Sequence, residues 1–259
     1  MSETINSRQK RAESIPYQVL ASIYNQVMRH VNYHHWAGYI QNIIGKNLNE
    51  PVKMLDIGCG TGELIHQVGK FGYKADGCDP SEAMLAVARL KNPHRKFWTD
   101  RLPELGNTPS GKYNVMTSLY DTVNYLTSLD DIDKALDRIY RILPANSLFI
   151  FDLVSQTFCK LYFDNVRDEE VLDGQYAYKR NSYFVQESSE QINEFAIYTP
   201  DGIFEERHIQ KIYGFEEIEK LIRQKTDFEI VGIYEDFTFY EADPKSNRAH
   251  FVLRKINHD

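Results

Sequence analysis

The chain has 259 residues, enough to bury one large core, and its 37 acidic residues exceed its 30 lysines and arginines by 37 − 30 = 7. No concentrated Lys/Arg run interrupts this acidic balance, so we expect neither a nucleic-acid nor a membrane partner. The three widely spaced cysteines form neither a disulfide framework nor a CxxC metal clip, which indicates reduced thiols and a cytoplasmic protein.

The N-terminal part, residues 1–45, reads as a tail followed by a helical lid. Residues 1–14 are polar, without the apolar stretch of a secretory signal, and predict a loose tail. From residue 16 to residue 44 apolar side chains recur every three or four positions, which predicts one or two amphipathic helices. His30 and His34, four residues apart, would share a helix face, but no further ligand completes a metal site, so we expect none.

Residues 46–155 alternate strand-like and helix-like segments, which predicts an α/β core with a doubly wound, mostly parallel sheet. Ser81 is a plausible cap of one helix. The expected strands are 52–57, 73–79, 95–99, 113–120 and 147–154, and the expected helices are 62–72, 81–91 and 129–143.

The alternation weakens after residue 155. Residues 156–214 contain three strand-like runs and a Pro-Asp-Gly turn, typical of an antiparallel meander, so we predict a β-rich insertion that contacts the substrate. Residues 215–259 read as a helix and two strands that complete the core sheet.

The most informative stretch is LDIGCGTGEL, in which Gly58, Gly60 and Gly62 come directly after the first core strand. Glycines there allow a ligand to approach the backbone amides at a helix N-terminus. The dinucleotide pattern G-x-G-x-x-G would need glycine where Glu63 stands. Asp56 and Glu63 would repel a pyrophosphate, whereas a ligand with ammonium and sulfonium groups would be favoured.

This loop resembles the first motif of the class I S-adenosylmethionine-dependent methyltransferases. CDPSEAML is similar to their second motif and FWTDRLPEL to their third, and the likeness covers roughly residues 17–155 and, more weakly, the terminal strands. It implies S-adenosylmethionine as cofactor and a seven-stranded Rossmann-like sheet. The cofactor-binding residues that it implies are Tyr33, Asp56, Gly58, Cys59, Gly60, Gly62, Asp79, Pro80, Asp100, Arg101 and Leu119.

Two of these residues have specific implied roles. Asp79 would bind the ribose hydroxyls and Asp100 would accept a hydrogen bond from the adenine amine. Taken singly, Asp79 is also a plausible helix cap and Asp100 a plausible turn residue. Cys59 reads as a small loop residue rather than a nucleophile, because nothing nearby is arranged to activate it.

The residues after the fourth core strand predict the acceptor. SLYDTVNYL lacks the [DNS]-P-P-[YFW] box of the nucleic-acid amino-methylating enzymes and is similar to the small-molecule N-methyltransferases of the sugar-amine and glycine type. In those relatives tyrosines of an N-terminal lid reach the methyl group, which implies a catalytic role for Tyr24 and cofactor contact for Tyr33. Ordinary aromatic packing is the alternative for both.

Two further catalytic candidates are Asp121 and His208. Asp121 lies with Tyr120, Asn124 and Tyr125 at the carboxyl edge of the sheet, where it would pair with an amine or simply start a helix. His208 lies in a strand whose alternation leaves open whether the ring faces the pocket, as base or hydrogen-bond partner, or faces solvent.

The sequence therefore predicts a methyltransferase that acts on a small molecule, with an amine nitrogen as the expected acceptor. The alternatives are a small-molecule O-methyltransferase, a relative that uses the cofactor for cyclisation or another group transfer, and a cofactor-binding regulator without catalysis. The sequence leaves open whether the protein forms a homodimer.

Overall fold

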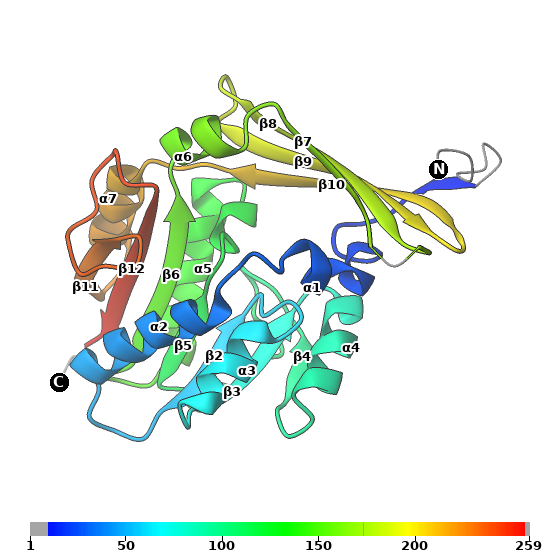
Figure 1. Ribbon diagram of the computed structural model, residues 1–259. Coiled ribbons are helices and arrows are strands. Elements are labelled where there is room, and N and C mark those ends of the chain that lie inside the picture. Colours follow the sequence, from blue (N-terminus) through cyan, green and yellow to red (C-terminus); the bar gives the residue numbers. More distant parts are fainter. Residues whose placement is uncertain (1–9, 173, 257–259) are drawn as a thin grey trace.

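The computed structural model describes residues 10–172 and 174–256 and contains two sheets (Figure 1). The larger sheet has seven strands, and all neighbouring pairs are parallel except those made by β12. Their order is β11 (Phe228–Glu235), β12 (Arg248–Lys255), β6 (Leu148–Val154), β5 (Val115–Ser118), β2 (Lys53–Ile57), β3 (Lys74–Asp79) and β4 (Phe97–Thr99). The predicted doubly wound, seven-stranded α/β sheet is confirmed.

Helices cover both faces of this sheet, which explains the apolar character of its strands. All seven residues of β6 are buried, as expected for a strand between two layers of helices. One face packs against α5 (Leu129–Ile142) and α7 (Phe215–Lys225). The other packs against α2 (Tyr33–Asn47), α3 (Glu63–Lys70) and α4 (Glu82–Lys91).

Polar side chains define where several of these helices begin. The Ser81 hydroxyl accepts a hydrogen bond from the Met84 amide at 3.2 Å, and Ser128 does the same for the Asp131 amide at 3.1 Å. Each satisfies an amide that has no partner within the helix. The predicted cap at Ser81 is confirmed.

The second sheet has five strands and comes mostly from the insertion, which begins with the short helix α6 (Gln156–Tyr162). Its order is β1 (Arg11–Glu13), β10 (Gly202–Lys211), β9 (Glu190–Thr199), β8 (Ala177–Val185) and β7 (Val166–Val171). Strands β7 to β10 are antiparallel neighbours, so the predicted meander is confirmed.

The N-terminal segment, described from residue 10 to residue 44, differs from the prediction in two ways. Residues 11–13 are not a loose tail but form β1, which pairs in parallel with β10; residues 1–9 lie outside the described part. Of the one or two amphipathic helices expected between residues 16 and 44, α2 is present, whereas the chain before residue 32 forms only the short elements η1 (Leu20–Ser22) and α1 (Tyr24–Val27). These pack their apolar side chains against Tyr178, Phe195 and Ile197 of the insertion sheet. Tertiary contacts therefore stabilise two elements that are too short to be stable helices by themselves.

The two histidines of this segment do not share a helix. His34 lies in the first turn of α2, whereas His30 lies in the turn between α1 and α2, so that prediction was wrong. Within residues 10–172 and 174–256 no group of three or more potential ligands could hold a metal ion. In the same ranges no helix has the length and apolar character needed to cross a membrane.

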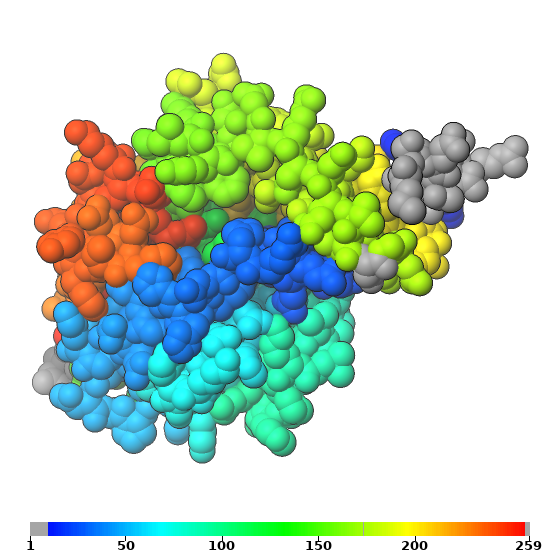
Figure 2. All heavy atoms as spheres, in the orientation of Figure 1, coloured from blue at the N-terminus to red at the C-terminus, as the bar shows by residue number. Residues whose placement is uncertain are grey.

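Figure 2 shows the N-terminal segment (blue) lying between the insertion (yellow-green) and the core (cyan). The segment therefore bridges the two sheets above the carboxyl ends of the core strands, where ligands bind in folds of this type.

Candidate functional site

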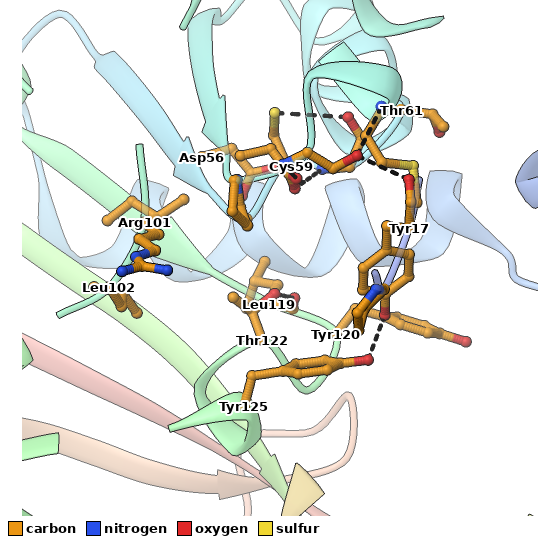
Figure 3. Close-up of a pocket in the computed structure, with 18 of the residues that line it drawn as sticks. Tyr17, Asp56, Cys59, Thr61, Arg101, Leu102, Leu119, Tyr120, Thr122 and Tyr125 are labelled. Atoms are coloured by element: carbon orange, nitrogen blue, oxygen red, sulfur yellow. Dashed lines mark hydrogen bonds between the residues drawn. The ribbon is translucent and has the colours of Figure 1, made fainter. Parts of the chain in front are cut away.

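A cavity of about 690 Å³ opens under the N-terminal segment, at the carboxyl ends of β2, β3 and β5 (Figure 3). This volume lies within the range of roughly 300–1,000 Å³ usual for small-molecule sites. The predicted site residues that line it are Tyr24, Tyr33, Asp56, Gly58, Cys59, Gly60, Asp79, Pro80, Arg101 and Leu119. Gly62, Asp100, Asp121 and His208 do not belong to its lining.

The glycine loop needs its glycines for two different reasons. Gly58 has φ +73°, and a Cβ there would lie 2.4 Å from the Cγ2 of Thr122, so the loop could not approach the chain after β5. Gly62 has φ +70° and precedes α3, where its carbonyl accepts a hydrogen bond from the Asn92 amide group at 3.0 Å. Gly62 therefore shapes the turn although it does not line the cavity.

Asp79 ends β3 and is almost completely buried. Its carboxylate accepts hydrogen bonds from the amides of Gly60 at 2.9 Å and Ser81 at 2.8 Å, which ties the glycine loop to the next strand. Burial raises the pKa of Asp79 to about 6 in spite of these two bonds. A ligand that donated to this carboxylate would therefore relieve an uncompensated charge.

Asp56 lies below the loop at the end of β2 and is also buried. It accepts a hydrogen bond from the Thr117 hydroxyl at 2.7 Å. Burial, with the nearby Asp79 charge as a smaller cause, raises the pKa of Asp56 to about 7. The buried thiol of Cys59 has its pKa raised by burial as well, in agreement with an unreactive loop residue.

Asp100 has a structural task. Its two oxygens accept hydrogen bonds from the amides of Arg101, Gly106 and Asn107 and from the Thr108 hydroxyl, at 2.8–3.0 Å. These bonds fold the loop after β4, and they place Arg101 rather than Asp100 on the cavity wall. The role of Asp100 toward an adenine amine stays a prediction.

Tyr24 and Tyr33 both face the cavity from the N-terminal segment. Burial raises the pKa of Tyr24 well above its usual value and that of Tyr33 to about 12, so both stay neutral hydroxyls at physiological pH. Two hydrogen bonds tie the same segment to the cofactor motifs. The Thr61 hydroxyl donates to the Asn25 side chain at 2.7 Å, and the Ser81 hydroxyl donates to the Tyr17 carbonyl at 2.8 Å.

Asp121 points away from the cavity. Its carboxylate pairs with the Arg248 guanidinium, which also pairs with the fully buried Asp152. Asp121 and its neighbour Tyr120 both have φ above +60°, so the chain turns sharply after β5. Of these two residues, Tyr120 lines the cavity and Asp121 does not. A direct ion pair between Asp121 and an acceptor stays a prediction that this geometry does not favour.

His208 is buried and does not face solvent. Its Nδ1 lies 3.1 Å from the Tyr125 hydroxyl, which lies 2.6 Å from the Tyr17 hydroxyl, and both tyrosines line the cavity. Its Nε2 lies 3.4 Å from Oε2 of Glu206. Sequence reasoning missed Tyr17 and Glu206. Glu206 and His208 are two residues apart and so lie on the same face of the strand. This spacing could have predicted that Glu206 lies next to His208.

The cavity is predominantly acidic. Its charged lining residues are Asp56, Glu63, Asp79, Arg101, Glu104 and Asp131. Arg101 is paired with Glu104 at 3.4 Å, and Glu63 is paired with Lys91. Gly60, where a Cβ would meet nothing within 4 Å, leaves the loop backbone open to a ligand. The residues present therefore fit the cationic S-adenosylmethionine and do not fit a pyrophosphate.

The comparisons with known proteins agree with this fit. The profile of a methyltransferase domain family matches residues 27–231. The Bacillus subtilis protein YqeM, whose name assigns it only provisionally to the methyltransferases, is 26% identical over 247 residues, which cover 92% of this chain and 97% of that protein. The dTDP-3-amino-3,6-dideoxy-alpha-D-glucopyranose N,N-dimethyltransferase of Streptomyces fradiae is 26% identical over 115 residues, or 44% of each chain.

Among solved structures, an S-adenosylmethionine-dependent methyltransferase from Clostridium acetobutylicum superposes with a TM-score of 0.76 at 22% identity. The match covers 92% of this chain and 98% of that one, so both the core and the insertion have counterparts in the same fold.

Proposed function

This chain belongs to the methyltransferase domain family and is an S-adenosylmethionine-dependent methyltransferase, and we propose that it transfers the methyl group to an amine nitrogen of a small molecule. The reaction is an in-line displacement at the methyl carbon, so the protein must align the acceptor lone pair and exclude water. Such positioning is worth about 7–11 kcal/mol.

The charge of the cavity is the observation that carries this proposal. Asp56, Asp79 and Asp131 face it, and Arg101, its one cationic lining residue within the described ranges, is already paired. An amine acceptor is cationic near neutral pH and is attracted to such a site, whereas a phosphorylated or carboxylate acceptor is repelled. The Streptomyces fradiae relative, which is named for N-methylation of an amino sugar, supports the same choice.

We assign the cofactor to the lining residues of the glycine loop, Asp79, Pro80 and Leu119. Asp79 would hold the ribose hydroxyls, and Arg101 would lie on the adenine side. Tyr33 would contact the methionine end, and Tyr24 would act near the methyl group. The bound cofactor supplies an electrophilic methyl carbon, and the chain supplies a closed, acidic compartment around it.

Incubation of the protein with methyl-labelled S-adenosylmethionine and a metabolite extract, read by mass spectrometry, tests the proposal. We expect the label on an amine nitrogen. A label on oxygen would support the O-methyltransferase alternative, and a cofactor product without methyl transfer would support cyclisation or another group transfer. The Asp79→Ala variant serves as the control for background labelling.

The remaining proposals concern the setting of the enzyme. We propose that it works in the cytoplasm without a nucleic-acid partner, in line with the acidic charge and with the free cysteines Cys59, Cys78 and Cys159. Analytical ultracentrifugation would determine whether the protein is a monomer or a homodimer.

A further inference from the structure

We propose that Tyr17, Tyr125 and His208 form a relay that removes the acceptor's proton from the cavity and delivers it to the buried His208–Glu206 pair. This inference rests on the proposed function, because an amine that arrives as an ammonium ion has no lone pair until it loses a proton. It assigns the residues that accept this proton.

The relay is continuous from the cavity to the interior of the insertion sheet. The Tyr17 and Tyr125 hydroxyls are 2.6 Å apart, as the dashed line in Figure 3 marks, and the Tyr125 hydroxyl is 3.1 Å from Nδ1 of His208. The Tyr17 ring also packs edge-on against the His208 ring, with centroids 4.5 Å apart. A proton can therefore pass along hydrogen bonds that already exist, with no rearrangement of the chain.

The carboxylate at the far end fixes the direction of these bonds. The amides of Tyr17, Val19 and Leu20 donate to Glu206 at 2.6–3.0 Å. Burial raises the pKa of Glu206, but the His208 side chain and these amide bonds outweigh it, so the pKa lies below its usual value and the carboxylate stays ionised. Nε2 of His208 has no hydrogen-bond partner among the described residues and lies 3.4 Å from Oε2 of this carboxylate. The nearby negative charge favours the ring proton on Nε2, which leaves Nδ1 with its lone pair. Tyr125 then donates to Nδ1, Tyr17 donates to Tyr125, and a lone pair of Tyr17 faces the cavity.

The proton transfer balances along this chain. An N–H bond of the ammonium breaks and its electron pair stays on nitrogen, while the proton binds the Tyr17 oxygen. Tyr17 passes its own proton to Tyr125, and Tyr125 passes its proton to Nδ1, which leaves two neutral tyrosines and an imidazolium beside Glu206. The freed pair forms the N–CH3 bond as the C–S bond breaks and its electrons remain on sulfur.

The buried environment of Tyr17 and Tyr125 keeps both hydroxyls neutral, so they can pass a proton on without becoming charged. Burial raises the pKa of both hydroxyls, with the Asp79 and Asp121 charges as smaller causes, so neither ionises near neutral pH. The titratable groups that face His208 are Glu206 on its own strand, Tyr17 of the N-terminal segment and Tyr125 of the 3-10 helix η2 (Val123–Tyr125). From β9 it is contacted by the apolar ring of Phe195. Glu206 is thus the one charge adjacent to the ring among the described residues.

The first test needs no acceptor. In protein labelled with ¹⁵N-histidine, we expect the spectrum to show the His208 ring proton on Nε2 and none on Nδ1. Tyr125→Phe should shift the Nδ1 resonance, whereas Tyr183→Phe, which removes a hydroxyl bonded to Glu194 on the same sheet, should not. A ring proton on Nδ1 in the wild type would overturn the relay.

The second test uses methyl-labelled S-adenosylmethionine and the amine fraction of a metabolite extract, with S-adenosylhomocysteine release measured from pH 6.5 to 9.5. We expect Tyr125→Phe and His208→Gln to lower the rate about 100-fold at pH 7. The deficit should shrink as pH rises, because more acceptor is then already deprotonated. Tyr183→Phe should follow the wild type, and unchanged binding of S-adenosylhomocysteine should show that the variants are folded.

The outcomes separate the two proposals. A wild-type rate in Tyr125→Phe, or a deficit equal at every pH, overturns the relay and leaves the N-methyltransferase intact. A wild type that methylates no amine in the extract overturns the proposed function and the relay together.

Discussion

The two sheets of the molecule bury their residues in different ways. In the core strand β6 every residue is buried, because helices cover both faces. In the insertion strand β10 buried Glu206, His208 and Gln210 alternate with residues that are more exposed, because one face packs on the rest of the protein. The core sheet is thus specified by continuous apolar segments, and the insertion sheet by every second residue.

The position of the buried charges follows from this difference. In the core sheet Asp56 and Asp79 lie near the ends of their strands, at the edge where the cofactor is expected. In the insertion sheet Glu206 lies inside its strand, and its charge is stabilised by hydrogen bonds from amides of another segment. In the functions proposed above, the core sheet binds the cofactor and the insertion sheet receives the proton of the acceptor.

The largest expected effect breaks the core sheet. Phe251 is completely buried and stacks on Phe151 with ring centroids 4.8 Å apart. We expect Phe251→Ala to lower the free energy of unfolding by about 3–5 kcal/mol, measured by urea denaturation. Arg207→Ala, on the outer face of β10, should change it by no more than about 0.5 kcal/mol. Equal losses in the two variants would contradict the comparison.

Asp79 tests the assignment of the cofactor to the core sheet. Asp79→Ala should weaken binding of S-adenosylhomocysteine by roughly 2–4 kcal/mol in calorimetry, since charge-assisted hydrogen bonds to the ribose would be lost. Glu206→Gln is the matched change in the insertion sheet and should cost turnover more than cofactor affinity. Unchanged affinity in Asp79→Ala would leave this residue as a loop and helix-start anchor only.

The protonation of Asp79 gives a pH dependence with a defined sign. Because its pKa is about 6 in the ligand-free protein and only the ionised carboxylate accepts both ribose hydroxyls, affinity should fall by up to about tenfold per pH unit below pH 6. The same raised pKa means that the folded state binds more protons than the unfolded state from about pH 4 to 6. The stability contribution of this group is therefore lost as pH rises through that window. Titrations at pH 7.5, 6 and 5 measure the effect on affinity, and Asp79→Asn should remove it.

The smallest expected effects concern the segment between the sheets. Residues 17–44 should exchange amide hydrogens more slowly once S-adenosylhomocysteine binds, because closure over the cavity orders them. Tyr33→Ala should weaken cofactor binding, and Tyr24→Phe should lower turnover more than affinity. Identical exchange in both states would show that the segment is part of the core and not a lid.

The sequence predicted the core and most of the residues that line the cavity beside the glycine loop, because both depend on local signals. The glycine loop, Asp79 and the Ser81 cap each lie at a strand end or begin a helix, so their positions can be read from neighbouring residues. Asp100 was harder, because its four hydrogen bonds come from a loop whose fold has no periodic signal.

The acceptor side depends on contacts between distant residues. Tyr17 and Glu206 are 189 positions apart in the chain and are joined by a hydrogen bond, and Tyr17 adopts φ +64°. No pattern in the sequence predicts either the contact or this backbone conformation. The extent of helix between residues 16 and 44 was overestimated for the same reason, since η1 and α1 are stabilised by contacts with the insertion sheet rather than by their own length.

The attachment of the N-terminal segment to β10 bears on how such enzymes can be recombined. Residues 11–13 pair with β10, and three amides of residues 17–20 bind Glu206, so the N-terminal segment and the insertion form one exchangeable unit in spite of their separation in the chain. A chimera that receives only the insertion, residues 156–214, from a relative would join mismatched halves of this unit. One that receives residues 10–28 as well would transfer the unit whole, because α1 also packs on the insertion sheet. If the insertion handles the acceptor as we propose, we expect this chimera to change acceptor preference and to keep its affinity for the cofactor.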